Sequence, residues 1–402
     1  YPTYAAYALT DRMANTPEIV NNFLEQLHEA SHPYSLKDKK EVEDFAHQLG
    51  LKGELQRWDW SYYSNKLMQE KYALDDEMLR PYFKLENVQK GVFDLATRLY
   101  GITFKEVNNI PLYHPEVKTY EVYDNDGSFL AVLYTDFFPR ESKGGGAWMT
   151  QFRGQKMVNG KDQRPLVSLV MNFTKPTDSK PSLLTFDEVT TFLHEFGHAL
   201  HGMFSKCTYG STSMDGVSRD FVELPSQFME NFAYEKEWLD TWAEHYQTGE
   251  KIPQEYIDKI KKSSNFQAGY ASERQLSFGM VDMAWHTITA PVTEPLVDFE
   301  QRAMGKTEVM PIVKGSAFST AFGHIFAGGY AAGYYGYKWA EVLDADAFSL
   351  FKQNGIFDKN TAESFRRNVL EKGASENPMT LYKRFRGQEP TIDALLERSG
   401  LK

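Results

Sequence analysis

The sequence has one cysteine, Cys207, in 402 residues. A single thiol cannot form an internal disulfide, which excludes a small fold held together by disulfides and favours a reducing, cytoplasmic compartment. The chain also has no apolar run of the roughly 20 residues that a membrane-spanning helix requires. We therefore expect no membrane partner.

Positive charge is scarcer than negative charge. Lys and Arg number 44 against 55 Asp and Glu, which gives a net charge of −11 at pH 7. Nucleic acids and anionic membranes attract basic surfaces, so this balance argues against both classes of partner. The chain begins Tyr1-Pro-Thr-Tyr4, which is neither an initiator methionine nor a signal peptide. We expect the natural N-terminus, with any export signal, to lie outside this sequence.

The pattern of apolar residues indicates a mainly helical chain with one small sheet. Helices are predicted from Thr16-Pro17 onward, from Ser35 to Gly50, and over residues 58–73 and 85–100. Residues 117–123 and 129–135 alternate around a turn at 124–127, which predicts a β-hairpin, and 147–152 and 166–173 are two further candidate strands. From residue 185 the pattern is helical to the end.

The most informative stretch runs from Thr185 to Gly202. Thr185 followed by Glu188 is typical of a capping box, so a helix should begin there. His194 and His198 are four residues apart and therefore lie on one face of that helix. Two neutral imidazoles at this spacing can bind one zinc ion, and Glu195 between them can reach a water molecule in the open coordination position. The alternative is a helix with surface histidines, but the apolar residues around them favour an interior or a cleft.

A zinc site needs a third protein ligand. His201 shares the face but lies about 10 Å further along the helix axis than His194, too far for one straight helix to bring both to one ion. Glu223 is the better candidate, because it opens a second predicted helix that has Pro225 near its start. The alternative is that Glu223 binds no metal and is an acid at the helix N-terminus that interacts favourably with the helix dipole. Glu230, two turns further on, is either an acid that orients an imidazole or an exposed helix residue.

Two more segments bear on the chemistry. The predicted sheet directly precedes the histidine helix, and zinc peptidases commonly bind substrate as an added strand along a sheet edge. Residues 322–339 combine glycines, tyrosines and one histidine in what we expect to be a loop leading into a helix. Tyr or His can stabilise the oxyanion of a tetrahedral intermediate, but composition alone leaves aromatic packing equally possible.

Together these segments resemble the thimet-oligopeptidase family of zinc metallopeptidases. The resemblance rests on three motifs: His194-Glu-Phe-Gly-His198-Ala-Leu-His, Arg219-Asp-Phe-Val-Glu223-Leu-Pro-Ser-Gln, and His324-Ile-Phe-Ala-Gly-Gly-Tyr330-Ala-Ala-Gly-Tyr334-Tyr-Gly-Tyr337. Residues 110–117, 136–148 and 385–390 look most like the bacterial peptidyl-dipeptidase branch. The similarity runs along essentially the whole chain, which looks like the C-terminal portion of a family member.

The resemblance implies a mainly α, neurolysin-like zincin fold with a small sheet beside the histidine helix and a deep substrate channel. It divides the chain into a helical segment, 1–110, that forms part of the channel wall, and a catalytic domain, 111–402, with the sheet at about 111–175. The family's N-terminal helical region would be absent. We expect a monomer that acts on short peptides.

The resemblance also implies the roles of single residues. His194, His198 and Glu223 match the ligands of one Zn²⁺ per chain, and Glu195 matches the catalytic base. His324, Tyr330 and Tyr337 match residues that contact the substrate or the tetrahedral intermediate, and Tyr334 is a weaker candidate. The implied reaction is release of dipeptides from peptide C-termini. The alternatives are an oligopeptidase that cuts internally and a truncated peptide-binding fragment without catalysis.

Overall fold

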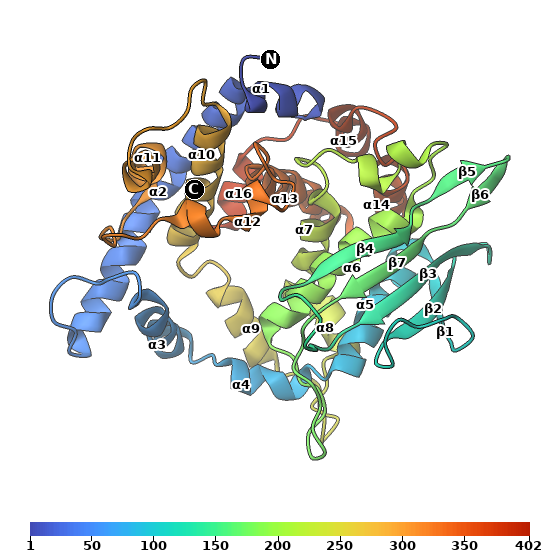
Figure 1. Ribbon diagram of the computed structural model, residues 1–402. Coiled ribbons are helices and arrows are strands. Elements are labelled where there is room, and N and C mark those ends of the chain that lie inside the picture. Colours follow the sequence, from blue (N-terminus) through green and yellow to red (C-terminus); the bar gives the residue numbers. More distant parts are fainter.

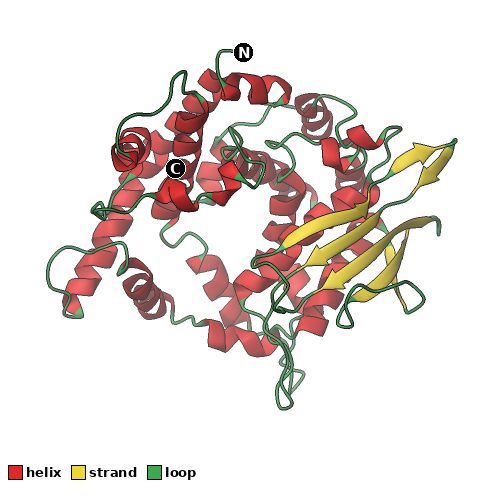
Figure 2. Ribbon diagram, in the orientation of Figure 1, coloured by secondary structure: helices red, strands yellow, loops and turns green.

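A computed structural model describes residues 1–402. Figures 1 and 2 show a mainly helical molecule with one small sheet at its side, as the sequence predicts. The α-helices are α1 (Tyr4–Ala8), α2 (Pro17–Gln48), α3 (Trp60–Tyr72), α4 (Asp76–Leu79), α5 (Leu85–Tyr100), α6 (Phe186–Phe204), α7 (Leu224–Glu230), α8 (Lys236–Trp242), α9 (Gln254–Ser263), α10 (Ala268–His286), α11 (Leu296–Met304), α12 (Gly323–Phe326), α13 (Gly336–Asn354), α14 (Lys359–Phe365), α15 (Pro378–Arg386) and α16 (Asp393–Arg398). No helix is long and apolar enough to cross a membrane.

The sheet has five strands in the order β1-β2-β3-β7-β4. These are β1 (Thr103–Val107), β2 (Lys118–Tyr123), β3 (Phe129–Asp136), β4 (Trp148–Arg153) and β7 (Leu166–Val170), while β5 (Lys156–Val158) and β6 (Lys161–Gln163) form a separate hairpin. The predicted hairpin of β2 and β3 is confirmed, and so are the strands β4 and β7. β3 and β7 pair in parallel, whereas β4 runs antiparallel to β7 and is left as an edge strand. The sequence analysis missed β1, β5 and β6.

One helix prediction is wrong. Ser35 does not cap a new helix, because α2 continues without a break from Pro17 to Gln48 and contains Pro33. The reason lies in the packing of α10 against α2. A Cβ on Gly269 would lie 2.5 Å from the backbone nitrogen of Ser35, so the two backbones approach as closely as a glycine permits. Ser35 is fully buried at this crossing, where contact with α10 outweighs its local preference for a cap.

The apolar interior forms two main cores. The larger one joins α5, the sheet, α6 and α7, and contains Phe192, Leu193 and Phe196 of α6. The smaller one lies between α2 and α10 and also contains Tyr334 and Tyr335, which precede α13. In Figure 1 α2, α10 and α11 lie on the opposite side of the molecule from the sheet. The two cores therefore carry two different sets of the predicted site residues.

Candidate active site and metal centre

Helix α6 positions the two histidines of the predicted metal site. Its start is fixed by a capping box, in which the Glu188 N–H donates to the Thr185 hydroxyl and the Thr185 N–H donates to the Glu188 carboxylate. Most of the helix is buried between the sheet and α7, while His194 and His198 remain partly exposed. Their ring centroids lie 5.0 Å apart. The local sequence therefore places both imidazoles on one accessible face.

Close contact between α6 and α7 brings the third predicted ligand into place. Glu223 is the N-cap of α7, and Pro225 follows in the first turn. A Cβ on Gly197 of α6 would lie only 2.3 Å from the Pro225 carbonyl oxygen and 2.6 Å from the Ser226 Cα. Glycine in a helix interior costs about 1 kcal/mol relative to alanine, and here it allows the two helix backbones to touch. This contact lets the Glu223 carboxylate face the histidines.

The three side chains fit a metal ion. Their ligand atoms all lie within 4.8 Å of one another. Glu223 Oε2 is 3.1 Å from His198 Nε2 and 3.4 Å from His194 Nε2. Two atoms bound to one zinc ion at about 2 Å and a tetrahedral angle lie about 3.3 Å apart. The spacing of the donors, their chemistry and the burial of Glu223 (3 % exposed) are therefore compatible with zinc.

Electrostatics make this cluster receptive to a cation. Burial alone would raise the pKa of Glu223, but His198 and His194 hold it well below its ordinary value. Burial would likewise lower the pKa of His194, yet hydrogen bonds to Glu223 and Glu230 raise it well above its ordinary value. Glu223 is thus held as a buried carboxylate that needs positive charge beside it, which a proton or a metal ion can supply.

Neighbouring side chains fix the orientation of the cluster. His194 Nδ1 lies 2.6 Å from Glu230 Oε1, so Glu230 orients this imidazole and is more than an exposed helix acid. The Ser226 hydroxyl donates to Glu223 Oε2 at 2.9 Å, and the Tyr330 hydroxyl donates to Glu223 Oε1 at 2.8 Å. The two oxygens of Glu223 are therefore both directed by hydrogen bonds.

Glu195 faces a cavity beside the two histidines. This cavity measures about 300 Å³ and is lined by Ala147, Thr190, Thr191, His194, Glu195 and Glu230. Burial raises the pKa of Glu195, while the charges of His194 and His198 oppose the shift. A higher pKa makes a carboxylate a stronger base. The cavity lies next to the start of β4, the edge strand of the sheet, as expected for a substrate that extends the sheet.

The tyrosine-rich segment contacts the cluster through the hydrogen bond from Tyr330 to Glu223. The rings of Tyr330 and Tyr337 stack with centroids 5.1 Å apart, and the exposed His324 ring lies 6.0 Å and 6.5 Å from them. Burial and the nearby Glu223 carboxylate raise the pKa of both tyrosines, so their hydroxyls remain protonated donors at neutral pH. Tyr334 differs, because its hydroxyl donates to Gln275 of α10 and is directed away from the cluster.

Asp282 of α10 holds this segment in place. Its fully buried carboxylate accepts hydrogen bonds from three successive backbone N–H groups, those of Ala332, Gly333 and Tyr334, each at 2.9 Å. His286 Nδ1 lies 2.7 Å from the same carboxylate. Asp282 is thus a positioning residue for the segment between Tyr330 and Tyr337. The sequence analysis missed it because its partners lie about fifty residues away along the chain.

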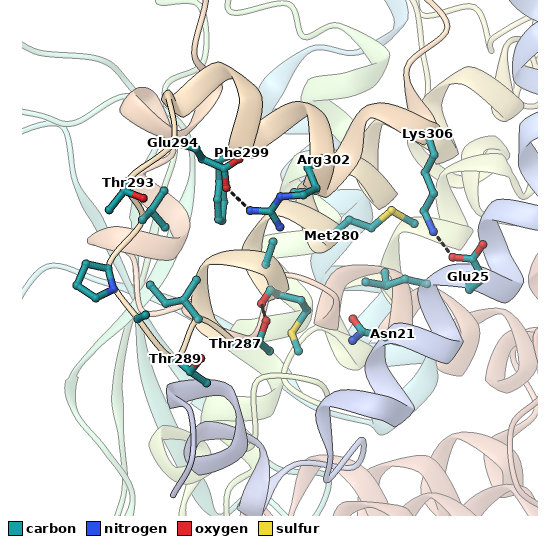
Figure 3. A pocket seen from close by; sticks show the side chains of 18 residues that line it. Asn21, Glu25, Met280, Thr287, Thr289, Thr293, Glu294, Phe299, Arg302 and Lys306 are labelled. Atoms are coloured by element: carbon teal, nitrogen blue, oxygen red, sulfur yellow. Dashed lines mark hydrogen bonds and ion pairs between the residues drawn. The ribbon is translucent and has the colours of Figure 1, made fainter.

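His201 and the cavity of Figure 3 lie outside the site. His201 is fully buried, and neither ring nitrogen has a hydrogen-bond partner, which agrees with its exclusion as a ligand. The cavity in Figure 3, about 630 Å³, lies between α2, α10 and α11 and contains none of the predicted site residues. The sequence analysis also missed the role of Gly197, although a glycine between two histidines of a helix was a signal of close backbone approach.

The chain is similar to known peptidases. The model of peptidase family M3 matches residues 1–401. Oligopeptidase A of Escherichia coli is 43% identical over the whole chain, and dipeptidyl carboxypeptidase of Salmonella typhimurium is 40% identical. The chain spans 60% and 59% of these two relatives. The solved structure of PZ peptidase A with inhibitor 2 is 13% identical, covers 98% of this chain and 59% of its own length, and has a TM-score of 0.54, which supports the fold.

Proposed function

Because this chain belongs to peptidase family M3, we propose that it hydrolyses amide bonds of short peptides with one zinc ion held by His194, His198 and Glu223. The observation that carries the proposal is the convergence of these side chains from two helices, beside a cavity that exposes Glu195. When bound, zinc supplies Lewis-acid chemistry that lowers the pKa of water and polarises a carbonyl.

We propose that the chain's own residues then move the protons. Glu195 accepts a proton from the attacking water and delivers it to the leaving amine, the two tasks of a general base in amide hydrolysis. Its buried carboxylate suits this role, since burial raises its pKa. Glu230 orients the His194 ring, and Ser226 and Tyr330 orient Glu223. These hydrogen bonds would keep the metal ligands in position.

We further propose that the tyrosine-rich segment stabilises the oxyanion of the tetrahedral intermediate. Tyr337 is the principal donor, because its hydroxyl is protonated at neutral pH and its ring stacks on Tyr330 beside Glu223. Tyr330 or the exposed His324 supplies a second contact to the substrate. Tyr330 donates to Glu223 in the structure, so it would have to exchange that bond for one to the substrate.

The finer reaction we propose is release of dipeptides from peptide C-termini. The relationship to a dipeptidyl carboxypeptidase, at 40% identity, favours it. Internal cleavage is the second candidate, favoured by 43% identity to an oligopeptidase A. A third possibility is that residues 1–402 bind zinc and peptides without hydrolysis, because the chain spans only about 60% of these relatives.

The test is hydrolysis of an unblocked octapeptide, with products identified by mass spectrometry and zinc measured on the same sample. We expect cleavage by the unaltered chain, and loss of about 100-fold or more in turnover for Glu195→Gln at unchanged zinc content. Turnover near the unaltered level in Glu195→Gln would exclude this residue as the base. Stoichiometric zinc with no cleavage by the unaltered chain would favour the third candidate, a peptide-binding protein without catalysis.

A further inference from the structure

A second group of two histidines and one glutamate lies far from the active site. His28 and His32 are four residues apart on α2, and Glu273 lies on α10. Glu273 Oε2 is 2.8 Å from His28 Nδ1 and 3.2 Å from His32 Nδ1. The ligand atoms of the three side chains lie within 4.8 Å of one another. Three potential metal donors therefore converge where α2 crosses α10.

This group resembles the active-site cluster, although Nδ1 of both rings faces the carboxylate here and Nε2 of both rings faces it at the active site. In both, a helix presents two histidines one turn apart, with ring centroids 4.9 Å apart here and 5.0 Å apart at the active site. In both, a second helix directs a buried carboxylate oxygen at the two rings. In both, a serine hydroxyl donates to that carboxylate, Ser31 to Glu273 at 2.5 Å and Ser226 to Glu223 at 2.9 Å. The same donor chemistry thus occurs twice in one chain.

The group is buried on one side and open on the other. The Glu273 side chain is 2% exposed, whereas His28 and His32 are 13% and 28% exposed. Glu25, one turn before His28 on the same face of α2, lines the cavity of Figure 3 and pairs there with Lys306. An ion can therefore approach from solvent, while the carboxylate that would receive it is fixed in the protein.

We propose that His28, His32 and Glu273 form a second, structural site for a divalent cation of the zinc class. Two imidazole nitrogens and one carboxylate oxygen suit Zn²⁺, and also Co²⁺ and Ni²⁺, better than Mg²⁺ or Ca²⁺, which prefer oxygen ligands. Without a cation, each ring can donate an Nδ1–H to Glu273 Oε2. When a cation binds, each ring takes the tautomer with its proton on Nε2, so that both Nδ1 atoms and Glu273 Oε2 become ligands and link the two helices.

The position of this site gives it a structural role. α10 carries Glu273 at the crossing with α2 and, nine residues later, Asp282, which holds the segment between Tyr330 and Tyr337. A cation that ties α2 to α10 therefore strengthens the support of that segment at a distance from the reacting atoms. Its removal loosens the helix pair without removing any ligand of the active-site metal.

Zinc stoichiometry tests the proposal. Excess Zn²⁺ is added to the full chain and unbound zinc is removed by desalting. The amount of zinc bound per chain is then measured by elemental mass spectrometry. We expect two equivalents for the unaltered chain and for Glu195→Gln, and one equivalent for His198→Gln. We also expect one for the double variant His28→Gln/His32→Gln, with two retained by the control His114→Gln. One equivalent in the unaltered chain that is lost in His198→Gln, or two equivalents in the double variant, overturns the proposal.

A spectroscopic measurement keeps the test independent of how well the double variant folds. Co²⁺ added to metal-free His198→Gln occupies only the second site, so the ligand-field absorption of tetrahedral Co²⁺ should appear at one equivalent. Adding Glu273→Gln to this variant should abolish the band, with circular dichroism reporting the fold. Absence of the band in folded His198→Gln overturns the proposal. Failure of peptide hydrolysis alone leaves both metal measurements unaffected, so the two proposals fail separately.

Discussion

At the scale of single residues, the tyrosines before and at the start of α13 differ in what their hydroxyls contact. Tyr330 donates to Glu223 of the metal cluster, Tyr334 to Gln275 of α10, and Tyr335 to the buried Asp220. Tyr337 stacks on Tyr330 beside the cluster, with ring centroids 5.1 Å apart. Of the three tyrosines that the resemblance offered as candidates, Tyr330 and Tyr337 lie near Glu223, whereas the Tyr334 hydroxyl bonds to α10.

This difference gives a matched pair of variants. Tyr337→Phe should lower kcat by about 100-fold with little change in KM, because it removes one oxyanion donor. Tyr334→Phe removes a hydroxyl from the same segment and should keep turnover near the unaltered level. Steady-state kinetics on an octapeptide measure both. Equal turnover for Tyr337→Phe and the unaltered chain would remove Tyr337 from the mechanism.

His201 should make stability depend on pH. Its complete burial lowers its pKa to about 3, whereas the unfolded chain has the ordinary value of 6.5. The unfolded state therefore binds more protons between these values, so the free energy of unfolding falls as pH falls below about 6.5. From pH 7 to pH 5 this residue should account for a loss of about 2 kcal/mol.

The matched variant is His201→Leu. Between pH 7 and pH 5 its free energy of unfolding should fall by about 2 kcal/mol less than that of the unaltered chain. Denaturant unfolding of the two metal-free proteins at both pH values measures the difference. The titrations of His194, Glu223 and the other groups are common to both proteins and cancel. An identical pH dependence in both would show that His201 takes up a proton in the folded state.

At the scale of elements, the active site depends on the distance between α6 and α7. Gly197→Ala places a methyl group 2.3 Å from the Pro225 carbonyl oxygen, so α7 must move and take Glu223 with it. Metal–ligand distances tolerate about 0.2 Å. We expect zinc affinity to fall at least about 10-fold, a loss of the size seen when ligand orientation is disturbed.

Gly202→Ala is the control, because its methyl group meets only side-chain atoms at 3.3 Å or more. Both substitutions favour the helical state by about 1 kcal/mol, so helix propensity cannot explain a difference between them. Zinc competition with a chromogenic chelator measures both affinities. Equal affinities for the two variants would mean that α7 does not depend on this contact.

The helices and strands also show which structural features the sequence patterns predict correctly. The helix α5 begins at Leu85 and ends at Tyr100, with Gly101 in the left-handed conformation, as its periodicity and its glycine predict. The capping box of α6 and the hairpin of β2 and β3 are equally local features and are present. The helix break predicted at Ser35 is absent. The close packing of Gly269 of α10 against Ser35 favours a continuous helix there.

At the scale of the whole molecule, the proposed site lies where the two cores meet. The histidines and Glu223 belong to elements of the larger core, and the tyrosine-rich segment joins the smaller one. A peptide substrate of the proposed reaction would have to lie between these two parts of the molecule to contact both sets of residues. How its C-terminus is recognised decides between dipeptide release and internal cleavage.

An octapeptide with an amidated C-terminus tests this choice. Dipeptide release needs the free carboxylate, and loss of a hydrogen bond to a charged group costs about 1.5–3 kcal/mol. We expect kcat/KM to fall at least about 10-fold relative to the unblocked peptide. Product masses give the cleavage position, and an N-acetylated octapeptide is the control. Equal rates with both C-termini, and internal products, would favour the oligopeptidase reaction.

The sequence by itself determined the features that depend on near neighbours in the chain. Helix periodicity and the capping box placed His194, Glu195 and His198 on one helix, since side chains four residues apart share a face whatever surrounds them. It also supplied Glu223 as the acid of the next helix. The same periodicity sets His28 beside His32, but nothing local points to their partner, Glu273, which lies more than two hundred residues away.

The tertiary structure decided which distant groups meet. It brought α7 onto Gly197, placed Glu230 against His194, and tied the tyrosine-rich segment to Asp282. These contacts join residues that local periodicity cannot relate, because they arise from the packing of two cores and from the need of buried polar groups for partners. The spacing of the motif thus came from the sequence, and the contacts that surround it came from the fold.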